Sequence, residues 1–202
     1  MMKYLVFLAA AMCLLLAGCA TTIRSDVTAF HEWPARLPDK SYAFDTPAPR
    51  EDTLEYRSYQ NLVRAELARL GFAEAGTADA AKLRVAMHFS SVDRPQRVFE
   101  AVDPFWGGPG YWPGRFHRYG PFGPDPFFYG PLEVRESILH NYERQLRVAI
   151  NGSDGKKLFD VRVHNTSSKA STPAVMPALV ASAFAGFPGQ SGVMHRVDLK
   201  LE

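Results

Sequence analysis

The sequence predicts an α+β fold: a curved, mainly antiparallel β-sheet with two helices on one face and a long loop insertion rich in glycine, proline and aromatic residues. Three observations support this class. Several segments alternate apolar and polar side chains, the period of a half-buried strand. Two helical segments flank these strands, an arrangement typical of α+β domains. One segment, residues 103–131, holds too much Gly and Pro for a helix or a central strand.

The N-terminus resembles a bacterial lipoprotein signal. Lys3 supplies a positive charge, and the apolar run that follows is too short to span a bilayer comfortably. The run ends in Leu-Ala-Gly-Cys, which looks like a lipobox, a motif in which a peptidase cuts before the cysteine and the cysteine carries the lipid. We therefore expect residues 1–18 to be removed, Cys19 to be acylated, and residues 19–202 to form one domain.

Cysteine content and charge exclude several kinds of bond and partner. Of the two cysteines, Cys13 leaves with the signal and Cys19 is acylated, so we expect no disulfide in the domain. The formal net charge is only +2, which gives no electrostatic reason to expect nucleic acid or a strongly acidic partner. Stability must then come from an apolar core.

The domain begins with two predicted strands. Ile23, Val27 and Phe30 indicate an irregular first strand, and the alternating residues 41–44 indicate a short second one. Prolines follow directly and end this second strand.

The first helix is the clearest element. Asp52 stands three residues before Glu55, which is the spacing of a capping box. Gly71 ends the helix. Its apolar residues recur with a period of 3.6, which favours a face packed on a sheet over a groove for a partner. They are Tyr56, Tyr59, Leu62, Val63, Leu67 and Leu70.

A long β-hairpin is predicted in the middle of the domain. Residues 83–89 alternate strictly, and this strand is expected to run on toward residue 102. A matching segment covers residues 132–150. A Gly- and Asn-rich turn at 151–155 then leads into a third alternating segment, so that residues 140–164 form a hairpin.

A second helix and a last strand complete the domain. Residues 173–187 begin with a proline, which the first helical turn tolerates, and contain almost no polar side chains. A helix that is apolar all round is usually buried on more than one side. The last strand covers residues 193–201, with Val197, Leu199 and Leu201 facing inward.

The order of elements along the mature chain is distinctive. A Tyr42-Ala43-Phe44 strand is followed by a helix that ends at Gly71 and then by Leu83-Arg84-Val85. Residues 142–159 and a Met-Pro-Ala-Leu helix that runs into Phe-Pro-Gly at 187–189 come next. In these features the chain is similar to bacterial lipoproteins of the DUF4136 family. The resemblance implies an envelope location and a fold class. Because the family is named for having no assigned function, it implies no catalytic residues.

The segment 103–131 is the main candidate for a binding site. Its 29 residues include seven Gly, seven Pro and ten aromatic residues, and none is aliphatic. Structureless loops longer than about 12–15 residues are uncommon and are usually functional or disordered. Either the rings collapse onto the sheet edge, or they form a surface for sugars, a partner or the membrane interface. The candidate residues are Phe105, Trp106, Tyr111, Trp112, Phe116 and Tyr119.

Catalysis and metal binding are not indicated. The six histidines are scattered singly, without the spacing of metal ligands, and His88 and His164 are expected to share the exposed face of the sheet. The chain lacks a nucleophile-elbow motif and a phosphate-binding glycine loop. We expect neither a cofactor nor a metal ion.

The resulting hypothesis is a non-enzymatic lipoprotein with a structural or adaptor role. The residue after Cys19 is Ala20 and not the Asp that retains lipoproteins at the inner membrane, so resemblance favours the outer membrane of a Gram-negative cell, facing the periplasm. Its expected partners are the membrane, through the anchor, and an envelope protein or cell-wall glycan. The alternative is a binding module for lipid or cell-wall glycan that uses the aromatic loop.

The lipobox generates a first prediction. Replacing the acceptor thiol in Cys19→Ala abolishes lipidation and leaves precursor or soluble protein, while the domain still folds, because the anchor is not part of a core. Metabolic labelling with a palmitate analogue measures the effect. Label retained on the alanine variant, at unchanged gel mobility, would contradict the lipoprotein hypothesis.

Overall fold

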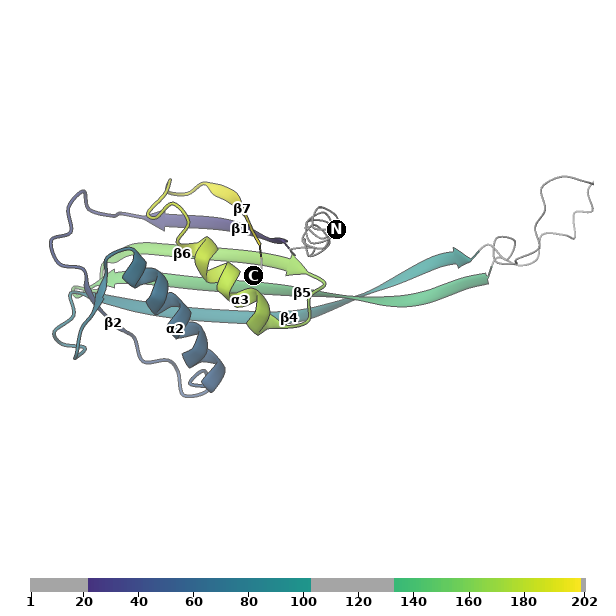
Figure 1. Ribbon diagram of the computed structural model, residues 1–202, viewed down its shortest axis with the longest axis horizontal. Coiled ribbons are helices and arrows are strands. Elements are labelled where there is room, and N and C mark those ends of the chain that lie inside the picture. The colour runs from purple at the N-terminus through teal and green to yellow at the C-terminus, as the bar shows by residue number, and fades with distance from the viewer. Residues whose placement is uncertain (1–21, 103–132, 201–202) are drawn as a thin grey trace, which may run out of the picture.

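The computed structural model of the chain describes residues 22–102 and 133–200. These residues form one seven-stranded sheet and two helices (Figure 1). In chain order the elements are β1 (Thr22–His31), β2 (Ser41–Phe44), α2 (Leu54–Arg69), β3 (Ala73–Glu74), β4 (Leu83–Val102), β5 (Glu133–Gly152), β6 (Lys157–Ser167), α3 (Thr172–Ala183) and β7 (Met194–Lys200).

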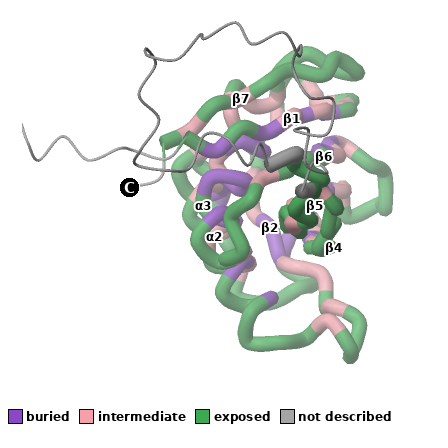
Figure 2. Tube along the Cα trace, turned by 90° about the vertical axis from the view of Figure 1, so that its right-hand side faces the viewer, coloured by how far each residue is buried: buried purple, intermediate pink, exposed green. Residues whose placement is uncertain are grey.

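The sheet confirms the predicted α+β class. Its strand order is β3-β2-β4-β5-β6-β1-β7. Neighbours from β4 to β7 pair antiparallel, whereas β2 pairs parallel with both β3 and β4. Both helices lie on the same side of the sheet, as the view along the strands shows (Figure 2). An antiparallel sheet tolerates this arrangement because its second face can remain in water.

Helix α2 forms where the period predicted it, but its cap differs from the prediction. Thr53 is the N-cap, and its side-chain oxygen accepts a hydrogen bond from the backbone N–H of Tyr56 at 3.0 Å. Asp52, the predicted cap, lies one residue too early and instead forms an ion pair with Arg57 at 2.9 Å. Threonine and aspartate are both good N-caps, so the sequence alone did not show which of these two adjacent residues caps the helix. The helix ends before Gly71, whose φ of 80° confirms its predicted role as the stop.

Helix α3 is buried, as its composition predicted, but it is shorter than expected. Ser171 caps it, and Pro173 lies in the first turn. The helix ends at Ala183, and the following residues turn instead of continuing to residue 187. Its one polar side chain in the core, Ser182, is satisfied within the helix because its hydroxyl donates to the carbonyl of Ala178 at 2.7 Å.

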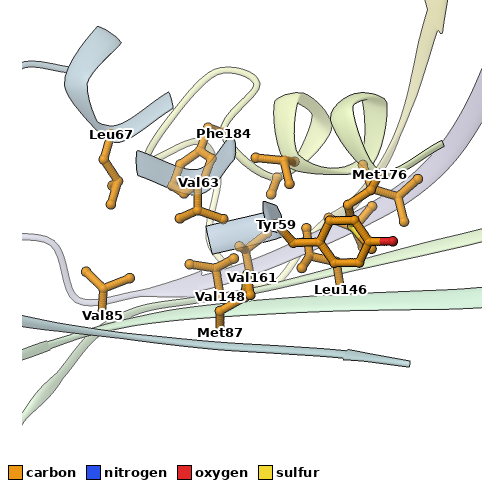
Figure 3. Close-up of a cluster of buried hydrophobic side chains, with 14 of the residues drawn as sticks. Tyr59, Val63, Leu67, Val85, Met87, Leu146, Val148, Val161, Met176 and Phe184 are labelled. Atoms are coloured by element: carbon orange, nitrogen blue, oxygen red, sulfur yellow. The ribbon is translucent and has the colours of Figure 1, made fainter. Parts of the chain in front are cut away.

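The hydrophobic core lies between the two helices and the inner face of the sheet (Figure 3). Side chains from α2 and α3 meet the alternate residues of β4, β5 and β6 there. The labelled members of this cluster are Tyr59, Val63, Leu67, Val85, Met87, Leu146, Val148, Val161, Met176 and Phe184. Because the described residues contain no cysteine, burial of this cluster supplies their main stabilisation.

The hairpin predicted at residues 140–164 is confirmed, with its strand pairing covering residues 142–167. β5 and β6 pair from Tyr142↔Ser167 to Asn151↔Lys157, with a register shift next to Ile150. The predicted extension of the 83–89 strand is also confirmed, because β4 continues to residue 102 and pairs along its whole length with β5. The predicted loop insertion at 103–131 lies outside the described residues.

One expectation about β1, which lies between β6 and β7 in the sheet, needs correction. β1 is a regular strand with Ile23 and Val27 inward, but Phe30 points to the opposite face and is 54% exposed. Its even number places it out of phase with those two residues, and a ring near a strand end tolerates water. In β7, Val197 and Leu199 are packed against the core as predicted, while Leu201 lies outside the described residues.

Among the residues that the structure describes, the helices are too short or too polar to cross a membrane.

The turn between β5 and β6 generates a second prediction. Gly155 has a φ of 82° and open space where a Cβ would stand. Gly155→Val should therefore destabilise the domain by backbone strain alone, by about 1–2 kcal/mol. Gly76→Val is the matched control, because Gly76 also has open space around it but no left-handed φ. Urea denaturation compares the two, and equal losses of stability would show that strain is not the cause.

Candidate functional site

A two-stranded arm projects from the sheet (Figure 1). Residues 94–102 of β4 pair with residues 133–141 of β5 after β6 has ended at Ser167. On the other side, β2 leaves β4 already at Val85. Nine paired residues at ~3.3 Å each give the arm a length of about 30 Å. Both edges of the arm therefore present backbone N–H and C=O groups that no third strand of the described sheet covers.

Charged side chains on the arm and at its base pair with one another. Three cross-strand pairs are present, with these nitrogen–oxygen distances: Arg94 with Glu143 at 3.1 Å, Arg97 with Glu136 at 3.4 Å, and His140 with Asp93 at 2.7 Å. Exposed pairs of this kind contribute little to stability. The two arginine–glutamate pairs leave these four charges locally neutralised.

Apolar side chains of the arm are exposed on the face that continues the core face of the sheet. Phe99 is 64% exposed, Val134 57% and Ile138 56%. Phe99 stands opposite Glu136, so Val134 and Ile138 are its diagonal neighbours on that face. We call these three residues the apolar cluster of the arm. Grouped exposed apolar side chains of this kind mark interaction surfaces more often than single ones do.

A buried arginine closes the core at the root of the arm. Arg144 points to the same inner face as Leu146 and lies two residues closer to the arm along β5. It is fully buried. Its guanidinium donates to the hydroxyls of Thr172 and Ser167, at 3.0 and 3.1 Å. It also donates to the backbone carbonyl of Lys169 and, at 3.2 Å, to that of Ala170.

This hydrogen bonding fixes the loop between β6 and α3. Hydrogen bonds from the guanidinium take the place of strand pairing for residues 167–172. These bonds position the start of α3. Ser91, opposite Arg144 on β4, bonds the same Thr172 hydroxyl at 3.0 Å. Burial lowers the pKa of Arg144 from its usual value, but an arginine stays protonated. The charge is therefore held by neutral oxygens, which makes Arg144 a structural residue.

A small depression lies beside the N-terminus of α2. It has a volume of about 190 Å³ and is lined by residues that include Glu51, Tyr56 and His88. His88 Nδ1 lies 3.2 Å from a carboxylate oxygen of Glu51, and the Tyr56 hydroxyl donates to the Met87 carbonyl at 3.1 Å. His88 is thus paired with Glu51, and the Tyr56 hydroxyl is engaged by the backbone of β4.

The predicted shared face of His88 and His164 is confirmed. Their registers place His88 opposite Arg147 and His164 opposite Gln145, so both lie on the open face of the sheet. Among the described residues, no group of three His, Cys, Asp or Glu side chains is arranged to hold a metal ion.

One serine and one histidine lie close together but do not form a catalytic pair. The Ser191 hydroxyl accepts from the backbone N–H of His31 at 3.0 Å, whereas the His31 ring contacts the Gly189 carbonyl at 3.1 Å. The ring therefore does not face the hydroxyl that it would have to activate.

The residues predicted to carry function fall outside the described part of the chain. This holds for the lipid-attachment residue Cys19 and for the six aromatic candidates of the loop: Phe105, Trp106, Tyr111, Trp112, Phe116 and Tyr119. The structure adds which two strands this segment joins. Residues 103–132 connect the two strands of the arm at the end distant from the core.

Comparison with known proteins gives a family and several distant structural likenesses, two of which are described here. Residues 26–189 match the family described as "Domain of unknown function (DUF4136)". Among curated proteins, none matches the chain. A PDZ domain protein from Parabacteroides distasonis ATCC 8503 is 12% identical with a TM-score of 0.47, over 95% of this chain and 42% of that protein's length. A PelC dodecamer from Paraburkholderia phytofirmans is 12% identical with a TM-score of 0.38, over 80% of this chain and 95% of the PelC chain.

The role of Arg144 generates a third prediction. Arg144→Lys keeps the charge but removes the planar fork, so several of the oxygens that it bonds lose their donor. The expected loss is about 1–3 kcal/mol of unfolding free energy. The matched control is Arg147→Lys, three residues along the same strand, where the arginine is half-exposed and pairs with Asp160. Its expected loss is at most about 1 kcal/mol. Denaturant unfolding measures both, and a larger loss at Arg147 would contradict the structural role of Arg144.

Proposed function

The chain belongs to the DUF4136 family, and we propose that it is a non-enzymatic lipoprotein of the cell envelope with a structural or adaptor role, anchored through an acylated Cys19. The anchor is supported by the order of charge, apolar run, small residues and cysteine at the N-terminus. One acyl chain binds a membrane only marginally, so a multiply acylated cysteine is the form that gives stable anchoring.

The observation that carries the structural or adaptor role is the arm. A domain that only filled space would not need a two-stranded ribbon about 30 Å long. The ribbon presents exposed apolar side chains at a distance from the core. The clustered polar groups of the described residues, by contrast, are engaged in the fold, as the bonds of Arg144 and of Tyr56 illustrate. This combination favours contact with another component of the envelope over chemistry on a small molecule.

We place the lipoprotein at the outer membrane, facing the periplasm, of a Gram-negative bacterium. The support is Ala20, because the signal for retention at the inner membrane is an Asp at this position. Nucleic acid is not a proposed partner, since the net charge is close to neutral.

A binding module for lipid or cell-wall glycan is the alternative function. It is favoured by the ten aromatic residues of segment 103–131, whose rings suit stacking on sugars or insertion among headgroups. The two functions differ in one measurable property. A binding module purified from the envelope carries a defined lipid or glycan, which native mass spectrometry detects. An adaptor carries no such ligand.

The arrangement of core and arm generates a fourth prediction. The described core is continuous from β1 to the end of α3 and is assembled by residues on both sides of segment 103–131. Replacing Trp106–Phe128 with a short Gly/Ser linker should therefore leave a cooperatively folded protein of similar Tm, because loop length affects stability only weakly. Binding to cell-wall sacculi, liposomes or an envelope partner should drop sharply in the same variant.

The two halves of this experiment are read separately. A variant that no longer unfolds cooperatively would mean that the rings belong to the core, and the loop would lose its standing as a recognition surface. A folded variant with full binding would exclude the aromatic loop as the binding site.

A further inference from the structure

The arm projects from the end of the sheet at which β1 starts, and the proposed lipid anchor precedes β1 in the sequence. Strand pairing sets Asp26 of β1 opposite His164 of β6, His164 opposite Gln145 of β5, and Gln145 opposite Ser90 of β4. These four residues therefore lie at one level across the sheet. β1 runs antiparallel to β6 and therefore starts at the end of the sheet where β4 leaves it. Thr22, four residues before Asp26, is thus level with the first residue pair of the arm. Figure 1 shows the start of β1 on the side of the molecule from which the arm projects.

The arm is longer than the tether. Cys19 precedes Thr22 by three residues, which span at most about 11 Å when fully extended. Beyond the level of Thr22 the arm continues for eight residue pairs, or about 26 Å. With Cys19 acylated, the arm therefore reaches about 15 Å farther toward the membrane than the anchor does.

The domain does not have the freedom to turn its arm away from the bilayer. That orientation would place the body of the sheet between Thr22 and the membrane. β1 alone covers ten residues of that body, or about 33 Å. A three-residue tether does not bridge this length. The remaining orientations direct the arm into the headgroup layer or along it.

The surface of the arm suits the membrane interface and not the hydrocarbon core. The apolar cluster of Phe99, Val134 and Ile138 is exposed, and Arg97 and Glu136 on the same face are paired with each other across the strands. Its open edges need partners that water and headgroups supply but acyl chains do not. A ribbon of two strands is also only marginally stable in water, so a covering surface stabilises it.

We propose that the arm is a second membrane contact, in which the apolar cluster lies in the headgroup region of the same bilayer that holds the acylated Cys19. This inference rests on the proposed lipid anchor and names the component that the arm touches. Together, the anchor and the arm hold the domain in one orientation, because two separate contacts remove the rotation that a single tether allows.

Site-directed fluorescence tests the contact on the full lipidated protein. Ile138→Cys carries an environment-sensitive NBD label on the apolar cluster, and Ser153→Cys carries it in the turn at the opposite end of the sheet. Both proteins are reconstituted into equimolar phosphatidylethanolamine and phosphatidylglycerol vesicles. We expect the label at 138 to shift to the blue, to be shielded from iodide and to be quenched by lipid-borne nitroxide. The label at 153 should stay open to iodide.

The other outcomes overturn the proposal in distinguishable ways. Vesicle-bound protein whose label at 138 is as open to iodide as the label at 153 refutes the arm contact and leaves the anchor intact. A label at 138 shielded from iodide but not quenched by the lipid nitroxide assigns the arm to another protein copy instead. Protein that does not float with the vesicles refutes the lipid anchor, and the arm proposal falls with it.

A charge substitution provides an independent check. Phe99→Glu adds a carboxylate to the apolar cluster and should reduce lipid quenching of the label at 138. Phe30→Glu is the matched control, because Phe30 is similarly exposed but lies near the far end of β1, away from the arm. Equal lipid quenching in the two variants would contradict a contact through the cluster.

Discussion

The pairing of β4 with β5 is the constraint on which the rest of the structure depends. The two strands pair residue by residue from Leu83↔Gly152 to Val102↔Glu133. Their inner halves carry the centre of the core, and their outer halves form the arm. A slip of one residue would turn every side chain to the other face. The register that places Val85 and Met87 under the helices therefore also places Phe99 and Ile138 together on the arm.

Arg144 marks the point at which the same ladder changes its role. On its core side, the inward residues of β5 are aliphatic and covered by α3. At Arg144 the inward position is filled by a charge that bonds the loop preceding α3, and beyond it the helices no longer cover the strands. A buried charge without a carboxylate is costly unless it is fully hydrogen-bonded. The need to satisfy it ties the start of α3 to the root of the arm.

Alternation and helical period predicted most of the fold, because both report which side chains face the core. They placed α2, the β5–β6 hairpin and the extension of β4 correctly. They did not predict the parallel pairing of β2 with β4, since an alternating segment of four residues is compatible with either direction. They also assigned the cap of α2 to Asp52, because two adjacent residues were both good caps and only the backbone decides between them.

The sequence predicted less of the candidate site than of the fold. The lipobox and the aromatic segment are local patterns, so the sequence alone was sufficient to identify them as hypotheses. The alternation of β5 contained a signal for Arg144, which shares the inward phase of Leu146 and Val148. That phase predicts burial but not the bonds to residues 167–172, which depend on tertiary structure. The arm and the start of β1 lie at the same end of the sheet because of the strand order and pairing directions. A single sequence does not specify that order.

Cross-strand disulfide formation tests the central register most directly. In protein with Cys13 and Cys19 replaced by alanine, cysteine pairs are introduced at Gln96/Leu139 and at Arg97/Ile138, which are successive opposite positions of the arm. One of the two is a closely spaced pair, so it should oxidise readily in the monomer. The slipped pair Gln96/Ile138, whose side chains lie on opposite faces, should remain reduced. Oxidation of the slipped pair to the same extent, or of none of the three, would contradict a continuous ladder from the core to the tip of the arm.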